Sequence, residues 1–353
     1  MQPRRLVVDA RGLGVHGGRG IGRVIVELLR ALTRLGVEAD VVGPVSVREH
    51  IGPSLRWVCK PARHVNNILT PGDLDGDRIL RLAHTLPGPL DDRSVACCYD
   101  LMPLKAPFQH YPWRTRLRRP LAWPAMRRSF DLYPRAHTVW TISQTTAVDA
   151  QRMLGIPSTR LVPIPLAAPG WATPTSAAQI LEVRRRFRLP EVFVLWVLSG
   201  LNDNKNVDGM LRAVGATVEL PPLIVAGNFA RKSQAKFTKE ARRAGAVHRS
   251  LGIVSDDDLR ALLAAAACVA VPSRDEGYAL PIAEALACGG LVVANDIPVL
   301  RELAHPRVIY ADASDPRAFG AALLAATRMP RPRAPAPSRS WDDVAREVLE
   351  LFS

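Results

Sequence analysis

Two glutamates stand eight residues apart in a segment where a buried strand would end and a helix would begin. Glu276 lies in the turn after an apolar run at residues 268–271, and Glu284 lies one to two turns into the helical pattern that follows. The backbone amides of this turn would point beyond the strand, where a helix N-terminus favours an anion and above all a phosphate. These amides belong to Gly277, Tyr278, Ala279 and Leu280. Carboxylates beside a phosphate site are suited to accept hydrogen bonds from sugar hydroxyls.

The residue pattern also predicts the elements that must position these glutamates. The apolar run before the turn is typical of a parallel strand that is buried on both faces. Pro281 suits the first turn of a helix, and Gly289 suits the residue just after a helix end. Apolar runs alternate with helical patterns through both halves of the chain. The sequence therefore predicts an α/β fold with two parallel-sheet layers.

Residues 276–289, EGYALPIAEALACG, resemble the donor-site signature of the retaining nucleotide-sugar glycosyltransferases of family 4. The fold of that family is GT-B, which consists of two Rossmann-like domains that face a central cleft. In the family the first glutamate contacts the donor sugar and the second holds the ribose hydroxyls, and the resemblance implies the same for Glu276 and Glu284. The alternative is an ordinary helix start that carries two solvated acids.

The loop at residues 199–206, SGLNDNKN, follows another apolar run and lies where ligands bind in parallel sheets. The resemblance implies that Lys205 grips the donor diphosphate, where a fixed cation stabilises the charge that develops on the leaving group. We therefore place Lys205 with Glu276 among the catalytic candidates. The alternative is a solvated lysine on an exposed loop.

This loop also departs from the family pattern. An arginine usually stands in it, whereas Gly200 and Asn204 occupy the two places where that arginine is found. Arg231, after the next predicted strand, could supply the missing charge, and we count it with Asn204 as a donor contact. Val254 stands where the family contacts the nucleobase through backbone groups, so we count it as a donor contact too.

A glycine-rich loop separates a first apolar run, residues 6–10, from an amphipathic helical pattern. Such a loop favours a phosphate or a ligand that approaches the backbone closely. The loop resembles the opening phrase of the same family and would help to seat the acceptor and the donor phosphate. Its candidate residues are Gly18, Gly20, Gly22 and Arg23. Glycines 12, 14 and 17 also match a dinucleotide fingerprint, which leaves an NAD(P)-binding oxidoreductase as an alternative.

A predicted strand at residues 95–98 leads into a phrase that resembles His-Asp-Leu-x-Pro-Leu of the family. Asp100 is kept, and the resemblance implies that it contacts the incoming hydroxyl, so we count it as a catalytic candidate. Tyr99 replaces the histidine, and we place it with the acceptor loop. The alternative for Asp100 is an aspartate that caps the next turn.

We expect no metal and no cofactor. Asp73, Asp75 and Asp77 form a DxD pattern of the kind that holds Mn²⁺ or Mg²⁺ in glycosyltransferases of another fold, but their Pro and Gly neighbours favour a polar turn. The five cysteines form no CxxC pair, which favours reduced core thiols over a zinc site or disulfides.

The formal net charge is +14, and the first 172 residues carry 24 Lys and Arg against 13 Asp and Glu. Residues 111–135 alone hold seven arginines with interleaved aromatic residues, a mixture that favours an anionic membrane surface. A solvated basic helix face is the alternative, and nucleic acid is not expected. There is no run of eighteen apolar residues and no signal-peptide pattern at the start. We therefore expect a cytoplasmic protein that can lie at the inner face of the membrane.

The proline-rich stretch at residues 161–174 predicts a hinge between two domains. We expect an N-terminal acceptor-binding domain over residues 1–168 and a C-terminal nucleotide-sugar-binding domain over residues 169–338. A final helix at residues 339–353 would cross back to the first domain, as the resemblance to GT-B proteins implies.

The resemblance implies a retaining, metal-independent hexosyltransferase. Its donor would be a nucleotide-diphosphate sugar of the mannose or rhamnose kind, and its acceptor a lipid-linked saccharide in cell-envelope polysaccharide or glycoconjugate synthesis. Three alternatives stay open: a non-catalytic GT-B protein that binds nucleotide-sugar, a sugar phosphorylase of the same fold, and the NAD(P)-binding oxidoreductase.

Overall fold

The structure is a computed structural model that describes residues 6–13, 20–50, 52–59, 78–82, 90–105, 123–198, 200–227, 231–330 and 339–352. The chain divides into two compact units. The described parts of Met1–Phe108, Trp113–Pro169 and Arg339–Ser353 form the first unit. The second unit is formed by the described parts of Gly170–Ser338.

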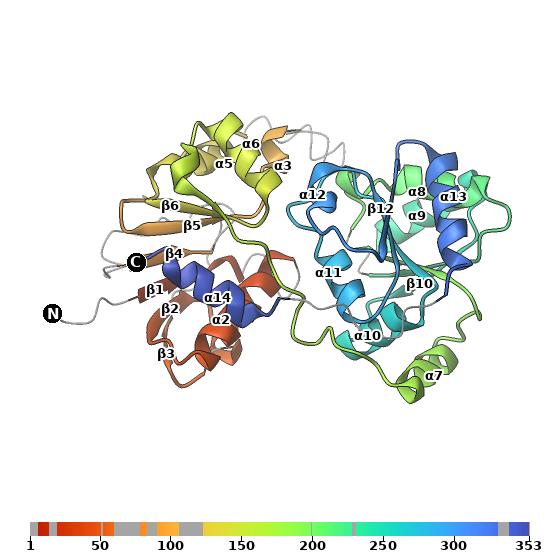
Figure 1. The fold of residues 1–353 in the computed structure, drawn as a ribbon, viewed down its shortest axis with the longest axis horizontal. Helices are drawn as coiled ribbons and strands as arrows, with labels where there is room; N and C mark the ends of the chain where they lie inside the picture. Colours follow the sequence, from red (N-terminus) through yellow and green to blue (C-terminus); the bar gives the residue numbers. More distant parts are fainter. Residues whose placement is uncertain are drawn as a thin grey trace. The chain divides into compact units, whose positions relative to one another are not determined.

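The first unit is built on a sheet of parallel strands (Figure 1). In the described residues the strand order is β3 (Leu55–Cys59), β2 (Ala39–Gly43), β1 (Leu6–Asp9), β4 (Arg78–Arg81), β5 (Ser94–Cys98), β6 (Thr138–Thr141) and β7 (Leu161–Pro163). The chain builds the sheet outward in one direction from β1 to β3, and then in the other direction from β4 to β7. The order therefore reverses between β1 and β4.

The helices of the first unit follow these strands. They are α2 (Ile21–Arg34), α3 (Met102–Lys105), α5 (Trp123–Phe130), α6 (Gln144–Leu154) and α14 (Trp341–Glu350), with the 3-10 helices η1 (Val45–His50), η3 (Tyr133–Arg135) and η4 (Ser158–Arg160). The final helix α14 packs against α2, and Arg34 Nη2 on α2 pairs with Asp342 Oδ1 on α14 at 2.6 Å. The last residues of the chain thus complete the first unit.

The second unit repeats the same plan. In the described residues its parallel strands have the order β10 (His248–Gly252), β9 (Leu223–Ala226), β8 (Val194–Val197), β11 (Cys268–Val271), β12 (Val292–Asn295) and β13 (Val308–Ala311). Its helices are α7 (Ala177–Arg186), η5 (Asp203–Lys205), α8 (Val207–Ala216), α9 (Arg231–Ala244), α10 (Asp256–Ala265), α11 (Leu280–Ala287), α12 (Pro298–Arg301) and α13 (Pro316–Thr327). Here the order reverses between β8 and β11. The predicted α/β fold with two parallel sheets is confirmed.

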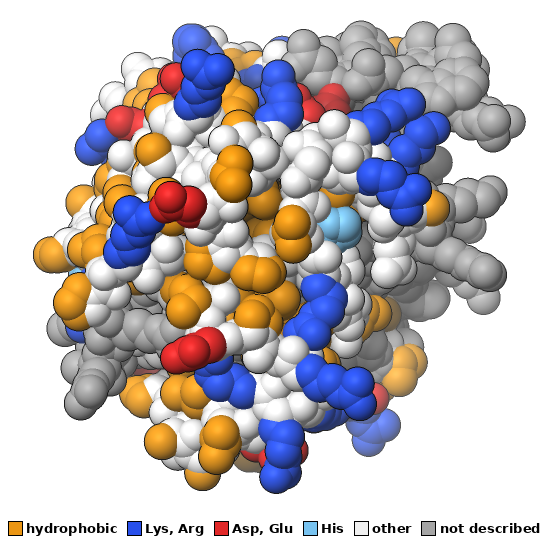
Figure 2. Space-filling model, turned by 90° about the vertical axis from the view of Figure 1, so that its right-hand side faces the viewer, with side chains coloured by type: hydrophobic (Ala, Val, Ile, Leu, Met, Phe, Trp, Pro, Cys, Tyr) orange, Lys and Arg blue, Asp and Glu red, His pale blue; other side chains and the backbone are white. Residues whose placement is uncertain are grey.

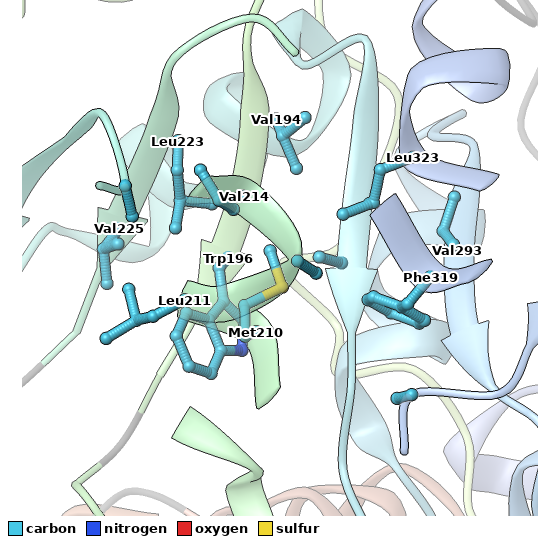
Figure 3. Packing of buried hydrophobic residues seen from close by; sticks show 14 of the residues in the cluster. Val194, Trp196, Met210, Leu211, Val214, Leu223, Val225, Val293, Phe319 and Leu323 are labelled. Atoms are coloured by element: carbon cyan, nitrogen blue, oxygen red, sulfur yellow. The ribbon is translucent and has the colours of Figure 1, made fainter. Parts of the chain in front are cut away.

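The core of the second unit fixes the elements on both sides of the loop that carries Lys205. Figure 3 shows Trp196 of β8 beside Met210 and Leu211 of α8, and Phe319 of α13 in the same cluster. All four side chains are at most 2% exposed. Burial of side chains of this size contributes about 1.5–3 kcal/mol each. The loop between β8 and α8 is therefore anchored at both of its ends.

The described cysteines are free thiols inside the two units. Cys97, Cys98, Cys268 and Cys288 are buried and form no disulfide among the described residues. Burial raises the pKa of the Cys268 thiol to about 12, and burial together with the charge of Glu284 raises that of Cys288 to about 12. Both thiols thus stay protonated at neutral pH, as expected of small core residues.

Within the part of the chain that the structure describes, no helix combines the length and the apolar character needed to span a bilayer. On the face drawn in Figure 2, the Lys and Arg side chains form several separate groups, with hydrophobic and acidic side chains between them. The described residues of this face therefore present no continuous basic surface.

Candidate functional site

The strand order of the second unit marks a ligand site. In open parallel sheets, ligands bind beyond the carboxyl ends of the strands, at the point where the strand order reverses. Here that point lies between β8 and β11, which are neighbours in the sheet. The loop after β8 carries Lys205, and the loop after β11 carries Glu276. The topology thus brings two of the predicted catalytic residues to one place, although they are far apart in the sequence.

Lys205 and Glu276 form a direct ion pair. The Lys205 Nζ atom donates to Glu276 Oε1 at 2.6 Å, and the two side chains are 20% and 10% exposed. This distance is typical of a charge-assisted hydrogen bond. An ammonium has three donors and a carboxylate has two oxygens, so both groups keep capacity for a ligand. The pair therefore presents a cation and an acceptor side by side, as a phosphate and a neighbouring sugar hydroxyl require.

Arg274 and Asn204 join the two loops behind this pair. Arg274 N donates to Asn204 O at 2.7 Å, and Asn204 Nδ2 donates to Asp275 O at 3.2 Å. The Arg274 guanidinium also donates to Asp203 O at 3.2 Å. Asn204 is 5% exposed, so its side chain holds the loop from inside, whereas the sequence predicted a donor contact.

Arg274 is a residue that the sequence analysis missed. Its Nη2 atom donates to Asp208 Oδ1 at 2.9 Å on helix α8. Burial alone would raise the pKa of Asp208, but the hydrogen bond and charge of Arg274, with the charge of Arg212, outweigh it and hold that pKa below its ordinary value. Its place two residues before Glu276 was the only signal in the sequence, and that place alone does not reveal a partner on another helix.

Helix α11 begins with a strained turn. Ala279 is its N-cap with φ 65° and ψ 59°, a left-handed conformation that non-glycine residues adopt at a cost of roughly 1–2 kcal/mol. Ile282 N donates to Ala279 O at 3.0 Å, and Pro281 stands in the first turn as predicted. Such strain is often retained at functional sites. The strained N-terminus lies just after Glu276, where its dipole favours an anion.

The second glutamate of the signature is buried within the same helix. Glu284 is 4% exposed and lies in the second turn of α11, whereas Tyr278 before the helix is 7% exposed. A carboxylate is kept at such a position only where partners compensate for the loss of water. Gly277 is also buried, and Leu280, the first helical residue, is half-buried. The four turn residues are thus part of the packed wall of the site.

Two further predicted donor contacts lie at or just before the starts of helices α10 and α9. Val254 is half-buried and directly precedes Ser255, the N-cap of α10, whose Oγ accepts from Asp258 N at 3.0 Å. It follows the edge strand β10, two strands away from β8. Helix α9 begins at Arg231, but the side chain of this residue lies outside the described part of the structure.

In the first unit, the predicted loop-to-helix junction is present. Gly20 is the N-cap of α2 with φ 54° and ψ −120°, a conformation that glycine adopts easily, and Val24 N donates to Gly20 O at 3.2 Å. Gly22 is buried in the first turn and Arg23 is half-buried. Gly18 lies outside the described residues.

Tyr99 and Asp100 make contacts within the fold. Tyr99 is 2% exposed, and its hydroxyl donates to Leu82 O at 3.0 Å. Burial raises the pKa of Tyr99 well above its ordinary value, so the hydroxyl stays protonated. Asp100 Oδ1 accepts from Met102 N at 3.0 Å and so caps the turn of α3. Both side chains therefore stabilise the ends of strands β4 and β5.

A buried ion cluster at the reversal point of the first sheet was also missed. Asp9 ends β1 and is fully buried; Arg11 Nε donates to its Oδ1 at 2.8 Å, and Arg81 Nη1 donates to its Oδ2 at 3.2 Å. Burial alone would raise the pKa of Asp9, but the two arginines outweigh it and hold that pKa below its ordinary value. The Asp-Ala-Arg phrase was visible in the sequence, but its partner Arg81 was not.

The structure speaks against a dinucleotide site after β1. In dinucleotide-binding folds, an acid near the end of the second strand binds the ribose. Here β2 ends at Gly43, and Asp40 near its start pairs with Arg56 at 2.6 Å. Asp40, the acid that could serve the dinucleotide fingerprint, thus lies near the start of β2 and pairs with Arg56. It is not placed to bind a ribose beyond the end of the strand.

Part of the predicted basic membrane segment belongs to the core. Phe130 and Tyr133 are fully buried and stack with ring centroids 6.1 Å apart, and the Tyr133 hydroxyl donates to Cys97 O at 3.0 Å. The expectation that these two rings lie at a lipid headgroup is therefore wrong, because both belong to a buried cluster that includes Ala147 and Ala150 of helix α6. Residues 111–122 lie outside the described part of the chain.

Metal ligation finds no support in the described residues. Among them, no group of three or more His, Cys, Asp or Glu side chains is arranged to hold a metal ion. The aspartates of the DxD pattern lie outside the described residues.

Comparison with known proteins decides what this site belongs to. The family model of glycosyl transferases group 1 matches residues 182–338, which include β8, β11, Lys205 and both glutamates. Residues 182–338 belong to this glycosyltransferase family. The two parallel-sheet units are those of the GT-B fold, and the chain is a glycosyltransferase.

Several curated relatives of the glycosyltransferase are mannosyltransferases, and others are D-inositol 3-phosphate glycosyltransferases of Salinispora species. It is 26% identical to O-antigen chain mannosyltransferase B of Escherichia coli, over 74% of this chain and 70% of that protein. It is 28% identical to the serotype-specific mannosyltransferase WbdA of Escherichia coli, over 63% of this chain but only 28% of that longer protein. A shorter match, 36% identical over 30% of this chain and 26% of that protein, is to the MMP alpha-(1->4)-mannosyltransferase of Mycolicibacterium hassiacum.

Solved structures show the same fold over the whole glycosyltransferase. Anabaena HepE in complex with UDP and glucose has a TM-score of 0.68 at 15% identity, with 99% of each chain covered. WaaG, a glycosyltransferase involved in lipopolysaccharide biosynthesis, has a TM-score of 0.66 at 14% identity, with 98% of this chain and 95% of that chain covered. At these identities the likeness concerns the fold alone.

Proposed function

We propose that this glycosyltransferase moves a mannose-like hexose from a nucleotide-diphosphate sugar to a saccharide acceptor in the synthesis of a cell-envelope polysaccharide. The observation that carries the proposal is the Lys205–Glu276 pair at the strand reversal of the second unit. Two relatives are mannosyltransferases, which supports mannose as the transferred sugar. One of them is named as an O-antigen chain enzyme, which supports the polysaccharide as product.

Each site residue binds a different part of the donor. Lys205 and the N-terminus of α11 bind the diphosphate, because a cation and a helix dipole both favour negative charge. Glu276 accepts hydrogen bonds from hydroxyls of the hexose, and Glu284 holds the ribose. As the bond between the hexose C1 and the phosphate oxygen breaks, Lys205 stabilises the charge that gathers on the diphosphate. One fixed donor of this kind is worth roughly 10²–10³ in rate.

We propose that the reaction retains the anomeric configuration and needs no metal. The acceptor hydroxyl attacks C1 from the face that the diphosphate leaves, and its proton passes to a leaving phosphate oxygen. The new C1–oxygen bond replaces the broken one, so no side chain of the protein has to become bonded to the sugar. The resemblance to family 4 supports this route.

We propose a lipid-linked saccharide as acceptor, bound to the first unit, with Gly20, Gly22 and Arg23 at the loop before α2. The arginines of residues 111–135 would contact an anionic bilayer at its cytoplasmic face. The buried rings of Phe130 and Tyr133 take no part in this contact. The basic composition of this segment supports the contact.

The first experiment identifies the donor and then follows its turnover. A thermal-shift screen of nucleotide sugars selects a ligand, and release of nucleoside diphosphate is then measured with saccharide acceptors, with and without EDTA. We expect turnover in both conditions, and NMR of the product should show the anomeric configuration of the donor. Tight donor binding without transfer or hydrolysis would instead indicate a non-catalytic nucleotide-sugar-binding protein. Inversion of the anomer, or loss of activity in EDTA, would contradict the proposed route.

A further inference from the structure

Two buried asparagines lie in the loop of Lys205 and at the end of a neighbouring strand. Asn206 follows Lys205 and is 0% exposed, and Asn295 ends the neighbouring strand β12 and is 6% exposed. Neither residue was singled out by the sequence. Most buried polar groups are hydrogen-bonded, so the partners of these carboxamides show what they hold. Asn206 binds through its Nδ2 atom alone, because its Oδ1 atom has no hydrogen-bond partner among the described residues.

The partners form one continuous chain of hydrogen bonds across four loops. Asn206 Nδ2 donates to Ala313 O at 3.0 Å, and Ala313 N donates to Asn295 Oδ1 at 2.8 Å. Asn295 Nδ2 then donates to Ser273 O at 2.9 Å. Ala313 and Ser273 are 2% and 3% exposed, so the whole chain is shielded from water. We call these four residues the asparagine bridge.

The asparagine bridge connects the loops that carry the reacting groups. It starts at Asn206, next to Lys205 in the loop after β8, and ends at Ser273, three residues before Glu276 in the loop after β11. Between them it passes through the end of β12 and the loop after β13. Asn204 and Arg274 join the same two loops closer to the ion pair. The Lys205 and Glu276 loops are thus tied twice, and one tie depends on two carboxamides.

The local geometry shows that the Asn206 side chain is held in one place. Asn206 has φ 53° and ψ 47°, a left-handed conformation that asparagine tolerates better than most residues. A Cβ atom on Gly209 would lie 2.3 Å from Asn206 Oδ1, so the glycine makes room for the carboxamide. Only a group with both a donor and an acceptor can serve at Asn295, which binds an N–H and a carbonyl at once.

We propose that Asn206 and Asn295 are positioning residues for glycosyl transfer, which act through the main chain of Ala313 to set the separation of Lys205 and Glu276. This inference rests on the proposed function for its rate effect, but not for its structural effect. Neither asparagine has to touch the donor. A shift of about 1 Å in reacting groups can cost on the order of 10²-fold in rate, so the bridge has catalytic consequences.

The test uses Asn206→Gly, which keeps the left-handed backbone, and Asn295→Ala, which removes both bonds of that carboxamide. The matched control is Leu323→Ala, since Leu323 is fully buried in the core of the same unit and takes part in none of the hydrogen bonds of the bridge. All three variants should lower the melting temperature. Only a variant that melts cooperatively is used for the measurements that follow, and either asparagine variant suffices.

The first readout is independent of activity. Lys205 is paired and mostly buried, so the rate at which an amine-reactive reagent labels it reports whether the pair is intact. The folded protein is labelled, and the modification of Lys205 is measured by mass spectrometry. We expect an asparagine variant to raise the labelling rate of Lys205 by roughly five-fold or more, while Leu323→Ala leaves it within two-fold. An unchanged rate in the asparagine variants, or an equal rise in the control, overturns the proposal even if the wild type proves inactive.

The second readout separates positioning from general damage in an active wild type. We expect the asparagine variants to lower kcat by roughly 10- to 100-fold with donor KM changed less than three-fold, whereas Leu323→Ala keeps kcat. In a Glu276→Gln background, the same asparagine substitution should lower kcat less than three-fold, because the pairing geometry that the asparagine sets is already lost. A decrease in kcat as large as in the wild-type background overturns the proposal. Wild-type turnover itself decides the proposed function, so the two failures are distinguishable.

Discussion

A double-mutant cycle on Lys205 and Glu276 examines whether the pair acts as one unit in catalysis. The atoms Lys205 Nζ and Glu276 Oε1 are 2.6 Å apart. Coulomb's law with an effective dielectric constant of about 20 gives roughly 6 kcal/mol of attraction, before the cost of removing both groups from water. Measured net values for hydrogen bonds to charged groups are about 1.5–3 kcal/mol. We therefore expect a coupling free energy of about 1.5–3 kcal/mol in the transfer reaction.

The expected rates follow from this coupling. Lys205→Met and Glu276→Gln should each lower kcat/KM by roughly 10²–10³-fold, as the loss of one fixed transition-state contact does. The double variant should lose about 10- to 100-fold less than the product of the two single losses, because each single change already disrupts the pair. The assay is the initial rate of nucleoside diphosphate release over a range of donor concentrations, with melting temperatures measured in parallel.

The second unit offers a matched lysine–glutamate pair as control. Lys236 and Glu240 lie one turn apart on α9, 3.6 Å from each other, with side chains 65% and 34% exposed. Exposed pairs of this kind contribute about 0–1 kcal/mol. Their Met and Gln variants should change the rate less than two-fold, singly or together. Strict multiplication of the Lys205 and Glu276 losses, or a loss below three-fold in either single variant, would refute the reasoning.

Three further predictions concern the buried acids and one close backbone approach. Glu284→Gln should raise the donor Kd at least ten-fold in calorimetric titration while binding of an analogue without the ribose hydroxyls stays the same, and an equal change for both ligands would contradict the ribose contact. Asp9→Asn should lower the free energy of unfolding by about 3–5 kcal/mol at pH 7, because it leaves two buried arginines uncompensated. The pKa of Asp9 is lowered in the fold, so the ionised carboxylate stabilises the protein above the unfolded pKa of about 3.9. This stabilisation is lost as the pH falls below that value. The difference in the free energy of unfolding between wild type and Asp9→Asn, measured by urea denaturation, should therefore shrink towards about pH 3. Gly227→Ala should destabilise the second unit by more than 2 kcal/mol, because the new Cβ would lie 1.8 Å from Leu198 O; a melting temperature within 1 °C of the wild type would show that the backbone yields there.

The fold class was predictable because hydrophobic patterns are local. Apolar runs such as Cys268–Val271 and Leu6–Asp9 are long enough to identify buried strands, and both lie in parallel sheets. Helix α6 carries a local signal at both ends, since Ser143 caps it through Thr146 N and Gly155 ends it with φ 67°. These signals need no knowledge of which strands are neighbours.

The contacts of the site depend on that missing knowledge. Lys205 and Glu276 were each predicted, but their pairing follows from the neighbouring positions of β8 and β11, which no local pattern encodes. The same holds for Asp9 and Arg81, which meet because β1 lies beside β4. Tyr99 shows the converse: its type suggested a ligand contact, but the fold uses its hydroxyl to bind a main-chain carbonyl.

The most direct measurement is a crystal structure of the protein with an intact nucleotide sugar. The account predicts that the diphosphate lies about 3 Å from Lys205 Nζ, at the N-terminus of α11, with the ribose at Glu284. A nucleotide bound instead at the strand reversal of the first unit, beside Asp9 and Arg81, would contradict it.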